Sequence, residues 1–332
     1  MDEIMVSVDC LVYKQERYLR KCLDSLVNQK TNFKYEILVH DDASPDSSSK
    51  IIKEYEQNYP DIIVPLYQTE NQYSKIETDM SWTFQFPRAR GKYIAFCEGD
   101  DYWTDDYKLQ KQFDAMEANP ECSFCTHRVA VVSEDDKETG QSFPEKPLDA
   151  GIYDERDFLN MVAIKHSFQT SSYFIRAEIL TKWLKEGSSI PKFVLTMPVG
   201  DKALIWLGAA SGKLYYLNDT MSHYRSAAAG SWSVRKSSDR KYGVNYRKKI
   251  IEASEEYNEF TDYRFDDIIK DQIVQRELTI ELIQRNYKSM LSSKYKKYFR
   301  QYPLKLRLKC IVGAFCPWVV RLSDRSGKST EE

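Results

Sequence analysis

Residues 6–42 read VSVDCLVYKQERYLRKCLDSLVNQKTNFKYEILVHDD, and this stretch decides the fold. It begins with a β-rich run, Val6 to Val12, and ends with a second apolar run, Tyr35 to His40. Between these runs, apolar side chains recur at helical spacing, at Leu19, Cys22, Leu23 and Leu26. A strand, a helix and a strand in this order predict two parallel strands of one sheet.

The same alternation continues along the chain. The expected helices cover about 49–59, 77–86 and 106–118, and the expected strands cover 61–67, 93–97 and 123–132. A polar loop is expected over 133–151, and helical patterns dominate from Arg240 onward. We therefore expect an α/β fold, in which a Rossmann-like, mostly parallel sheet carries helices on both faces and a C-terminal helical extension follows.

The composition indicates a folded chain, because 42% of the 332 residues are hydrophobic and 30% are charged. The net charge of −2 predicts no general affinity for nucleic acid. The charge is unevenly distributed, since residues 285–328 hold twelve Lys and Arg residues and a single acid, Asp324. A basic tail on an acidic body predicts an anionic surface as the partner of the tail.

The cysteines and the N-terminal residues predict a cytoplasmic protein. The chain has an odd number of cysteines, seven, and shows no signal peptide, so reduced thiols are expected. Cys122 and Cys125 form a lone CxxC pair, for which buried thiols in a strand are a better interpretation than a zinc site. The longest apolar run, Cys310 to Val320, is shorter than the roughly 20 residues that span a bilayer.

Two acidic clusters follow predicted strands, Asp41-Asp42 and Glu98-Gly99-Asp100-Asp101. Ligands of open α/β sheets bind at the carboxyl ends of the strands. Carboxylates that share one crevice repel each other unless a cation or hydrogen-bond donors lie between them. Such oxygens suit Mg²⁺ or Mn²⁺ that also binds a substrate diphosphate. Each cluster alone is equally compatible with a turn or an exposed helix start. Together the two clusters favour a functional site.

Three segments in order resemble the nucleotide-sugar domain of family-two glycosyltransferases, which are inverting enzymes of the GT-A fold. These segments are VSVDCLVYKQERYLRKCLDSLVNQ, YEILVHDDASPDSS and RGKYIAFCEGDDYW. A weaker resemblance continues through GDKALIWLGAASG and MSHYRSAAAGSWS, to about Ser233. The resemblance implies a nucleotide-sugar donor and a carbohydrate or lipid-linked saccharide acceptor.

The resemblance also implies roles for residues of the donor site. Tyr13 would line the base pocket, Asp42 would accept the imide N–H of a uracil-type base, and Asp41 would buttress Asp42. Leu11-Val12 and Lys14 depart from the family pattern here, so the base pocket is expected to differ.

The remaining implied roles concern the reaction. Asp101 would be the direct ligand of the metal ion, and Asp100 would bind the metal or sugar and ribose hydroxyls. Glu98 has a longer arm than the Asp usual at its position and would lie behind the direct ligands. Asp201 matches the general base, although a helix cap for residues 202–208 is an alternative.

One further departure concerns the diphosphate. Ala227 stands where the family often has His, so Arg225 alone would bind the phosphates. Trp103 and Trp232 are candidate sugar-stacking platforms, although a Trp near a site is often a packing residue.

The expected domain organisation has four parts. Residues 1–105 form the nucleotide-sugar half and 106–235 the acceptor half of one catalytic domain, followed by a helical extension over 236–285 and a basic amphipathic tail over 286–332. Within this tail, residues 288–325 are expected to contact the anionic inner face of the cell membrane through cations, apolar residues and aromatic side chains such as Tyr295 and Tyr298. The alternative is a helix that packs on the enzyme body.

Other functions are less consistent with the sequence. A nucleotidyltransferase would need a glycine-rich phosphate loop near the first strand, which the sequence lacks. The segment DDYWTDD resembles the acids of prenyl-diphosphate enzymes, but those acids lie on helices, and here they follow a strand. A non-catalytic carbohydrate-binding protein would not need the acids.

Overall fold

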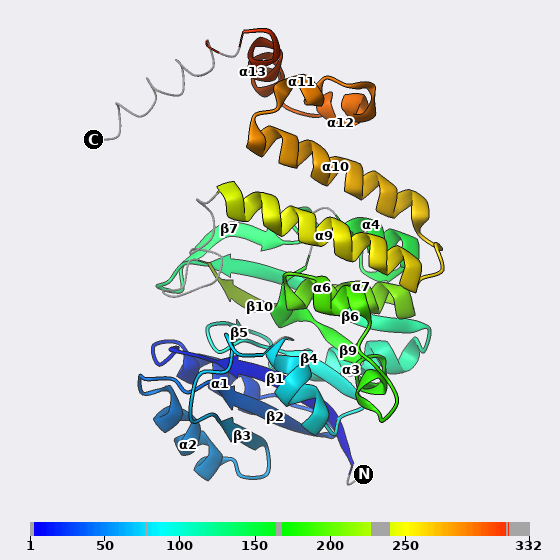
Figure 1. Cartoon of the computed structure of the whole chain (residues 1–332). Helices are drawn as coiled ribbons and strands as arrows, with labels where there is room; N and C mark the ends of the chain where they lie inside the picture. The colour runs from blue at the N-terminus through cyan, green and yellow to red at the C-terminus, as the bar shows by residue number, and fades with distance from the viewer. Residues whose placement is uncertain (1–2, 77–78, 164–167, 227–239, 317, 319–332) are drawn as a thin grey trace, which may run out of the picture. The chain divides into compact units, whose positions relative to one another are not determined.

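The structure is a computed structural model that describes residues 3–76, 79–163, 168–226, 240–316 and 318 (Figure 1). It divides into two compact units, Met1–Val234 and Arg235–Glu332.

Four parallel strands form the first half of the sheet in the first unit, in the order β3 (Ile63–Tyr67), β2 (Lys34–Asp41), β1 (Ile4–Val12) and β4 (Tyr93–Phe96). Val8 of β1 lies opposite Ile37 of β2 and Ala95 of β4. These strands are continuous apolar runs because both faces of a parallel sheet are covered. The predicted parallel core is confirmed.

The second half of the sheet is mixed. Strand β9 (Phe174–Arg176) pairs antiparallel with β4 and with β6 (Cys122–Val132), and β10 (Lys213–Arg225) runs parallel to β6. Three short strands complete the sheet: β5 (Tyr102–Trp103) and β8 (Gly151–Tyr153) on β10, and β7 (Glu138–Phe143) on β6.

The prediction of a loop over 133–151 was wrong for residues 138–143. Strand β7 is exposed over most of its length and pairs with β6 through its backbone, so no apolar alternation marks it. Cys122 and Cys125 are buried free thiols in β6, as predicted.

Helices cover both faces of the sheet. Three of them share one core with β1, β2 and β4: α1 (Leu19–Val27), α2 (Ser48–Asn58) and α3 (Lys108–Ala118). On the other face Phe124 of β6 contacts Phe158 of α4 (Glu155–Ala163) and lies against Gly208 of α7 (Gly200–Ser211). That face also carries the π-turn η1 (Ser81–Gln85) and the 3₁₀ turn η2 (Phe86–Arg88), where a longer helix was expected.

Four further short helical segments lie in the described part of the first unit. They are η3 (Thr170–Ser172), α5 (Ala177–Thr181), η4 (Lys182–Leu184) and α6 (Lys192–Thr196).

The second unit is helical, as the predicted C-terminal extension requires. Its elements are α9 (Arg240–Phe260), α10 (Asp266–Gln284), α11 (Tyr287–Met290), η5 (Ser293–Tyr295), α12 (Lys296–Phe299) and α13 (Leu304–Phe315). Leu278, Tyr287, Met290, Tyr295, Tyr298 and Cys310 form a buried cluster in this unit. The expectation that Tyr295 and Tyr298 face a membrane was therefore wrong, because both rings pack inside this unit. Among the helices that the structure describes, none combines the length and the apolar character needed to cross a bilayer.

Candidate active site

The carboxyl ends of β1, β2 and β4 meet at one edge of the sheet. The N–H of Asp42 donates to the carbonyl of Val12 at 3.0 Å, and the N–H of Gly99 donates to the carbonyl of Leu11 at 3.1 Å. A Cβ at position 99 would lie only 3.1 Å from Cγ2 of Val12, so glycine favours the close approach of the loop after β4 to β1. Tyr13, Asp42 and the acidic loop 98–101 are thereby neighbours.

Asp42 is buried and holds a loop that the sequence did not indicate. Its carboxylate accepts hydrogen bonds from Nδ2 of Asn71 at 2.6 Å and from the backbone N–H groups of Gln72 at 2.6 Å and Tyr73 at 3.2 Å. A carboxylate offers about four lone-pair sites. The loop uses three of these sites, and one remains to accept a hydrogen bond from a nucleobase.

Asp41 does not contact the Asp42 carboxylate through any hydrogen bond in the structure. Its carboxylate instead accepts the N–H of Ser44 at 3.1 Å and the hydroxyl of Ser49. These contacts are those of a turn residue, so the structure favours the turn interpretation of Asp41 over a buttressing role. The Tyr13 ring, by contrast, is 38% exposed at the end of β1 and is available to stack on a base.

Asp101 connects the loop after β4 to the end of β10. Its Oδ1 accepts the backbone N–H of Arg225 at 2.9 Å. Its Oδ2 is buried and has no hydrogen-bond partner within the described part of the chain. Burial, followed by the charge of Asp100, holds the pKa of the Asp101 carboxyl well above its usual range. An unpaired buried carboxylate oxygen is costly unless a proton or a cation binds it.

Arg225 does not present its guanidinium to a ligand. The side chain is 1% exposed, Nε donates to the carbonyl of Asp100 at 3.0 Å, and one terminal nitrogen lies 2.7 Å from Asp136. The other terminal nitrogen donates to the carbonyls of Ser133 and Glu134. These contacts occupy all three nitrogens of the guanidinium, so they do not support direct binding of a diphosphate. They instead position the backbone at Asp100.

Other carboxylates surround this edge of the sheet. The side chain of Glu98 is exposed, yet protein atoms crowd it closely enough to desolvate its carboxylate. This desolvation, together with the charges of Asp100, Asp201 and Asp79, raises the pKa of Glu98 to about 8. Asp9 and Asp79 were missed by sequence reasoning, although an acid inside the apolar run VSVDCLV was a visible signal.

Asp201 lies in the first turn of α7, where Oδ2 is 3.4 Å from the hydroxyl of Thr170. Its charge reaches Glu98 and Asp79, so α7 brings this carboxylate to the same acidic group. A Cβ at the preceding Gly200 would overlap the carboxylate of Asp79. Glycine at this position therefore allows Asp79 and the start of α7 to lie in contact.

The acids suit a metal ion that takes its remaining ligands from the substrate. Among the described residues, no three His, Cys, Asp or Glu side chains are close enough to hold a metal ion by themselves. Magnesium-type ions are often held by one or two carboxylates together with substrate phosphates. The unpartnered Oδ2 of Asp101 and the adjacent Asp100 satisfy this requirement.

Trp103 packs in the core and is 3% exposed. Its Nε1 donates to the carbonyl of Ser171 at 3.1 Å, and Nζ of Lys108 lies 3.9 Å from the ring centroid. The suggestion that Trp103 stacks on a sugar was therefore wrong. Trp232 and Ala227 lie outside the residues that the structure describes.

Comparison with known proteins identifies the family of the chain. Residues 7–182 match the family model described as Glycosyl transferase family 2. The chain is 34% identical over 238 residues to the uncharacterized protein Rv1520 of Mycobacterium tuberculosis. This alignment covers 71% of the chain and 63% of that protein, so less than two thirds of the relative is matched.

A second relative is matched over a shorter stretch. The chain is 36% identical over 104 residues to the poly(ribitol-phosphate) beta-glucosyltransferase of Bacillus spizizenii. This alignment covers 29% of this chain and 15% of that protein.

Among solved structures, S. aureus TarS 1–349 in complex with UDP-GlcNAc is similar, with a TM-score of 0.62 and 13% identity. The alignment covers 94% of this chain and 81% of that chain. At this identity the likeness concerns the fold alone, and it confirms the fold class predicted from the sequence.

Proposed function

The chain belongs to glycosyl transferase family 2, and we propose that it transfers a sugar from a nucleotide-diphosphate sugar to an acceptor hydroxyl, with inversion at the anomeric carbon. A UDP-sugar is the favoured donor. The observation that carries this proposal is the convergence of acids from separate elements at one sheet edge. Asp42 follows β2, Asp100 and Asp101 follow β4, and Asp201 begins α7.

The donor would bind across the ends of β1 and β2. Tyr13 offers an exposed ring for the base, and the remaining acceptor site on Asp42 matches the imide N–H of uracil. The loop 71–73, held by Asp42, would form the wall of this base pocket.

We propose that Asp101, with Asp100, holds Mg²⁺ or Mn²⁺ against the donor diphosphate. Such an ion neutralises the charge that develops on the leaving diphosphate. The chain contributes the buried Oδ2 of Asp101, and the hydrogen bond from Arg225 to Oδ1 fixes its direction. The guanidinium of Arg225 holds the carbonyl of Asp100 and thus the loop that carries both acids.

Asp201 is the proposed general base, which removes the proton of the acceptor hydroxyl as that oxygen attacks the anomeric carbon. Its place in the first turn of α7 keeps the carboxylate beside Asp79 and Glu98.

The proposed acceptor is a lipid-linked or cell-surface polysaccharide precursor. The poly(ribitol-phosphate) beta-glucosyltransferase relative supports this choice. We also propose that residues 288–325 contact the anionic cytoplasmic face of the membrane. The basic excess of the tail supports this contact, as does Trp318, which is 65% exposed.

Thermal-shift screening of nucleotides and nucleotide-sugars with Mn²⁺ tests the donor proposal, because ligands that bind only the folded state raise its stability. A stabilising nucleotide-sugar should then be consumed, slowly by water alone and faster with a saccharide acceptor. Binding without any release of nucleoside diphosphate would favour a non-catalytic nucleotide-sugar-binding protein. Release of pyrophosphate from a nucleoside triphosphate would favour a nucleotidyltransferase.

A further inference from the structure

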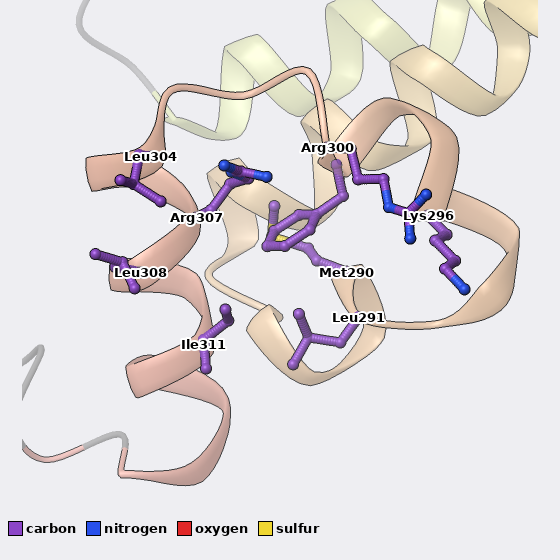
Figure 2. A pocket seen from close by; sticks show the side chains of 9 residues that line it. Met290, Leu291, Lys296, Arg300, Leu304, Arg307, Leu308 and Ile311 are labelled. Atoms are coloured by element: carbon purple, nitrogen blue, oxygen red, sulfur yellow. The ribbon is translucent and has the colours of Figure 1, made fainter.

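A cavity of about 340 Å³ lies in the C-terminal unit, between α11, α12 and α13. Its walls combine two kinds of side chain (Figure 2). One kind is apolar and includes Leu304, Leu308 and Ile311 along α13. The other is cationic, and none of the residues that line the cavity is acidic.

The three cations at the cavity are Lys296, Arg300 and Arg307. No carboxylate of the described residues lies within ion-pair distance of them. Neighbouring lysines do have partners, because Lys294 pairs with Glu277 and Lys297 pairs with Asp271, each at 2.6 Å. The acids of α10 thus neutralise other cations of the tail and leave these three with unbalanced charge.

Arg307 provides an independent observation. It extends from α13 toward the segment that carries Arg300 (Figure 2). Its Nε is buried and has no hydrogen-bond partner in the described part of the chain. A buried donor that carries positive charge is costly unless an acceptor reaches it, so Arg307 favours an anionic ligand with oxygen acceptors.

The apolar side of the cavity continues onto an open surface. Leu304, Leu308 and Ile311 are 63%, 53% and 40% exposed, and Phe315 is 77% exposed one turn further along α13. Their spacing places them on one face of the helix. A ligand that fits both features must therefore carry a phosphate-like anion and a hydrocarbon chain.

We propose that this cavity binds the phosphate group of one anionic membrane lipid, with the acyl chains of that lipid along the exposed face of α13. The proposal deepens the proposed membrane contact of residues 288–325 and rests on it. Charge complementarity favours a lipid over a second copy of this chain, since two copies joined here would bring six cations together. A lipid site of this kind would hold the enzyme in one orientation on the membrane. General charge attraction would not fix the orientation.

The test compares two variants of the full chain with the same change in charge. R300Q/R307Q removes two cations from the cavity, and K305Q/K309Q removes two cations of α13 that do not line it. Calorimetric titration with dihexanoyl phosphatidylglycerol below its aggregation threshold measures the site without a membrane surface. Co-sedimentation with vesicles of about one quarter phosphatidylglycerol in phosphatidylcholine measures the membrane contact.

The soluble lipid should bind the wild type and K305Q/K309Q with one-to-one stoichiometry, and R300Q/R307Q should weaken it at least about tenfold. Arg300→Gln alone, which alters an exposed side chain, should weaken it in the same direction if the double variant is poorly folded. Equal binding of the soluble lipid by both double variants overturns the proposal, as does equally tight binding of inorganic phosphate. A dimer in light scattering that R300Q/R307Q strengthens would assign this face to a second copy instead.

The two proposals can fail separately. If both double variants lose vesicle binding equally and neither they nor the wild type bind the soluble lipid, general charge attraction holds the tail and the lipid site is wrong. If the wild type fails to sediment with vesicles, the membrane contact is wrong, and failure to bind the soluble lipid then removes the lipid site as well.

Discussion

The backbone N–H of Arg225 donates a hydrogen bond of 2.9 Å to Oδ1 of Asp101, although 124 positions separate the two residues. This bond joins the loop after β4 to the end of β10. Oδ2 of Asp101 has no hydrogen-bond partner among the described residues. The side chain of Arg225 then holds the carbonyl of Asp100 at 3.0 Å. One residue thus fixes both acids of the proposed metal site.

Asp101→Asn should keep the fold and abolish metal-dependent binding of UDP. The amide oxygen of Asn can still accept the N–H of Arg225, whereas its NH₂ group cannot bind a cation. Calorimetric titration of UDP with Mn²⁺ and with EDTA measures the effect. Asp106→Asn, which disrupts only an exposed ion pair with Lys30, is the control and should bind UDP as the wild type does. Equal affinity of the wild type in Mn²⁺ and in EDTA would contradict the metal proposal.

Arg225→Lys should destabilise the protein by about 2 to 3 kcal/mol, because lysine cannot replace the hydrogen bonds to three carbonyls. Urea unfolding measures this loss. Asp136→Asn removes the ion pair at the same site and an exposed ion pair with Lys21, and its carboxylate is 39% exposed, so it should cost roughly 0–1 kcal/mol. Should the two variants be equally stable, the carbonyl contacts of Arg225 would have no measurable role.

Gly200→Ala should lower transfer activity, since the new methyl group would displace Asp79 from the start of the helix that carries Asp201. Gly243→Ala is the matched control in α9, where the nearest atom to a new Cβ is a flexible Arg247 nitrogen at 3.5 Å. That variant should be up to about 1 kcal/mol more stable, because alanine favours helix interiors over glycine. Turnover assays measure the activity of both variants, and thermal melts measure their stability. Unchanged activity of Gly200→Ala would separate Asp79 from the reaction.

The parallel half of the sheet could be predicted because its strands are unbroken apolar runs, such as Tyr35 to His40. Strand β7 could not, since its residues are mostly exposed and only backbone pairing with β6 identifies it. The site, too, could be predicted only in part. Sequence motifs indicated Asp42, Asp101 and Asp201.

The partners of these acids came only from the structure. Nothing in the spacing of the chain indicates that Asp42 binds the backbone at residues 72–73, or that the guanidinium of Arg225 is used by residues 133–136. Such contacts depend on how distant loops pack, which periodicity does not encode.

Asp201→Asn should retain donor affinity and lose roughly 10²- to 10⁴-fold of turnover, because a base acts on the acceptor rather than on the donor. Steady-state kinetics at saturating donor measure this loss. Glu178→Gln, which also removes an acid from the first turn of a helix, α5, is the control for a purely helix-stabilising role. Val199 and not Asp201 is the N-cap of α7, so the cap alternative becomes a charge in the first turn of the helix. If Asp201→Asn retains the turnover of Glu178→Gln, Asp201 stabilises the start of the helix and is not the base.

Asp9→Asn should change how stability depends on pH. Asp9 is 3% exposed in the middle of β1, and its Oδ1 accepts the amide of Gln85 at 2.7 Å. Burial raises the pKa of Asp9 to about 7, although hydrogen bonds from Ser81 and Gln85 oppose this shift. The folded state therefore keeps a proton that the unfolded state releases near its ordinary pKa of 3.8.

The sign follows from linkage. The stability that the protonated carboxyl contributes is fully present below the unfolded pKa and is lost as the pH rises through about 7. Between about pH 5.5 and 8.5, wild type should lose about 2 kcal/mol more of its free energy of unfolding than Asp9→Asn does. Urea unfolding of both proteins across this range measures the difference, in which contributions of groups common to both cancel. Parallel curves for the two proteins would mean that Asp9 is ionised in the folded state, and its burial would then require a cation nearby.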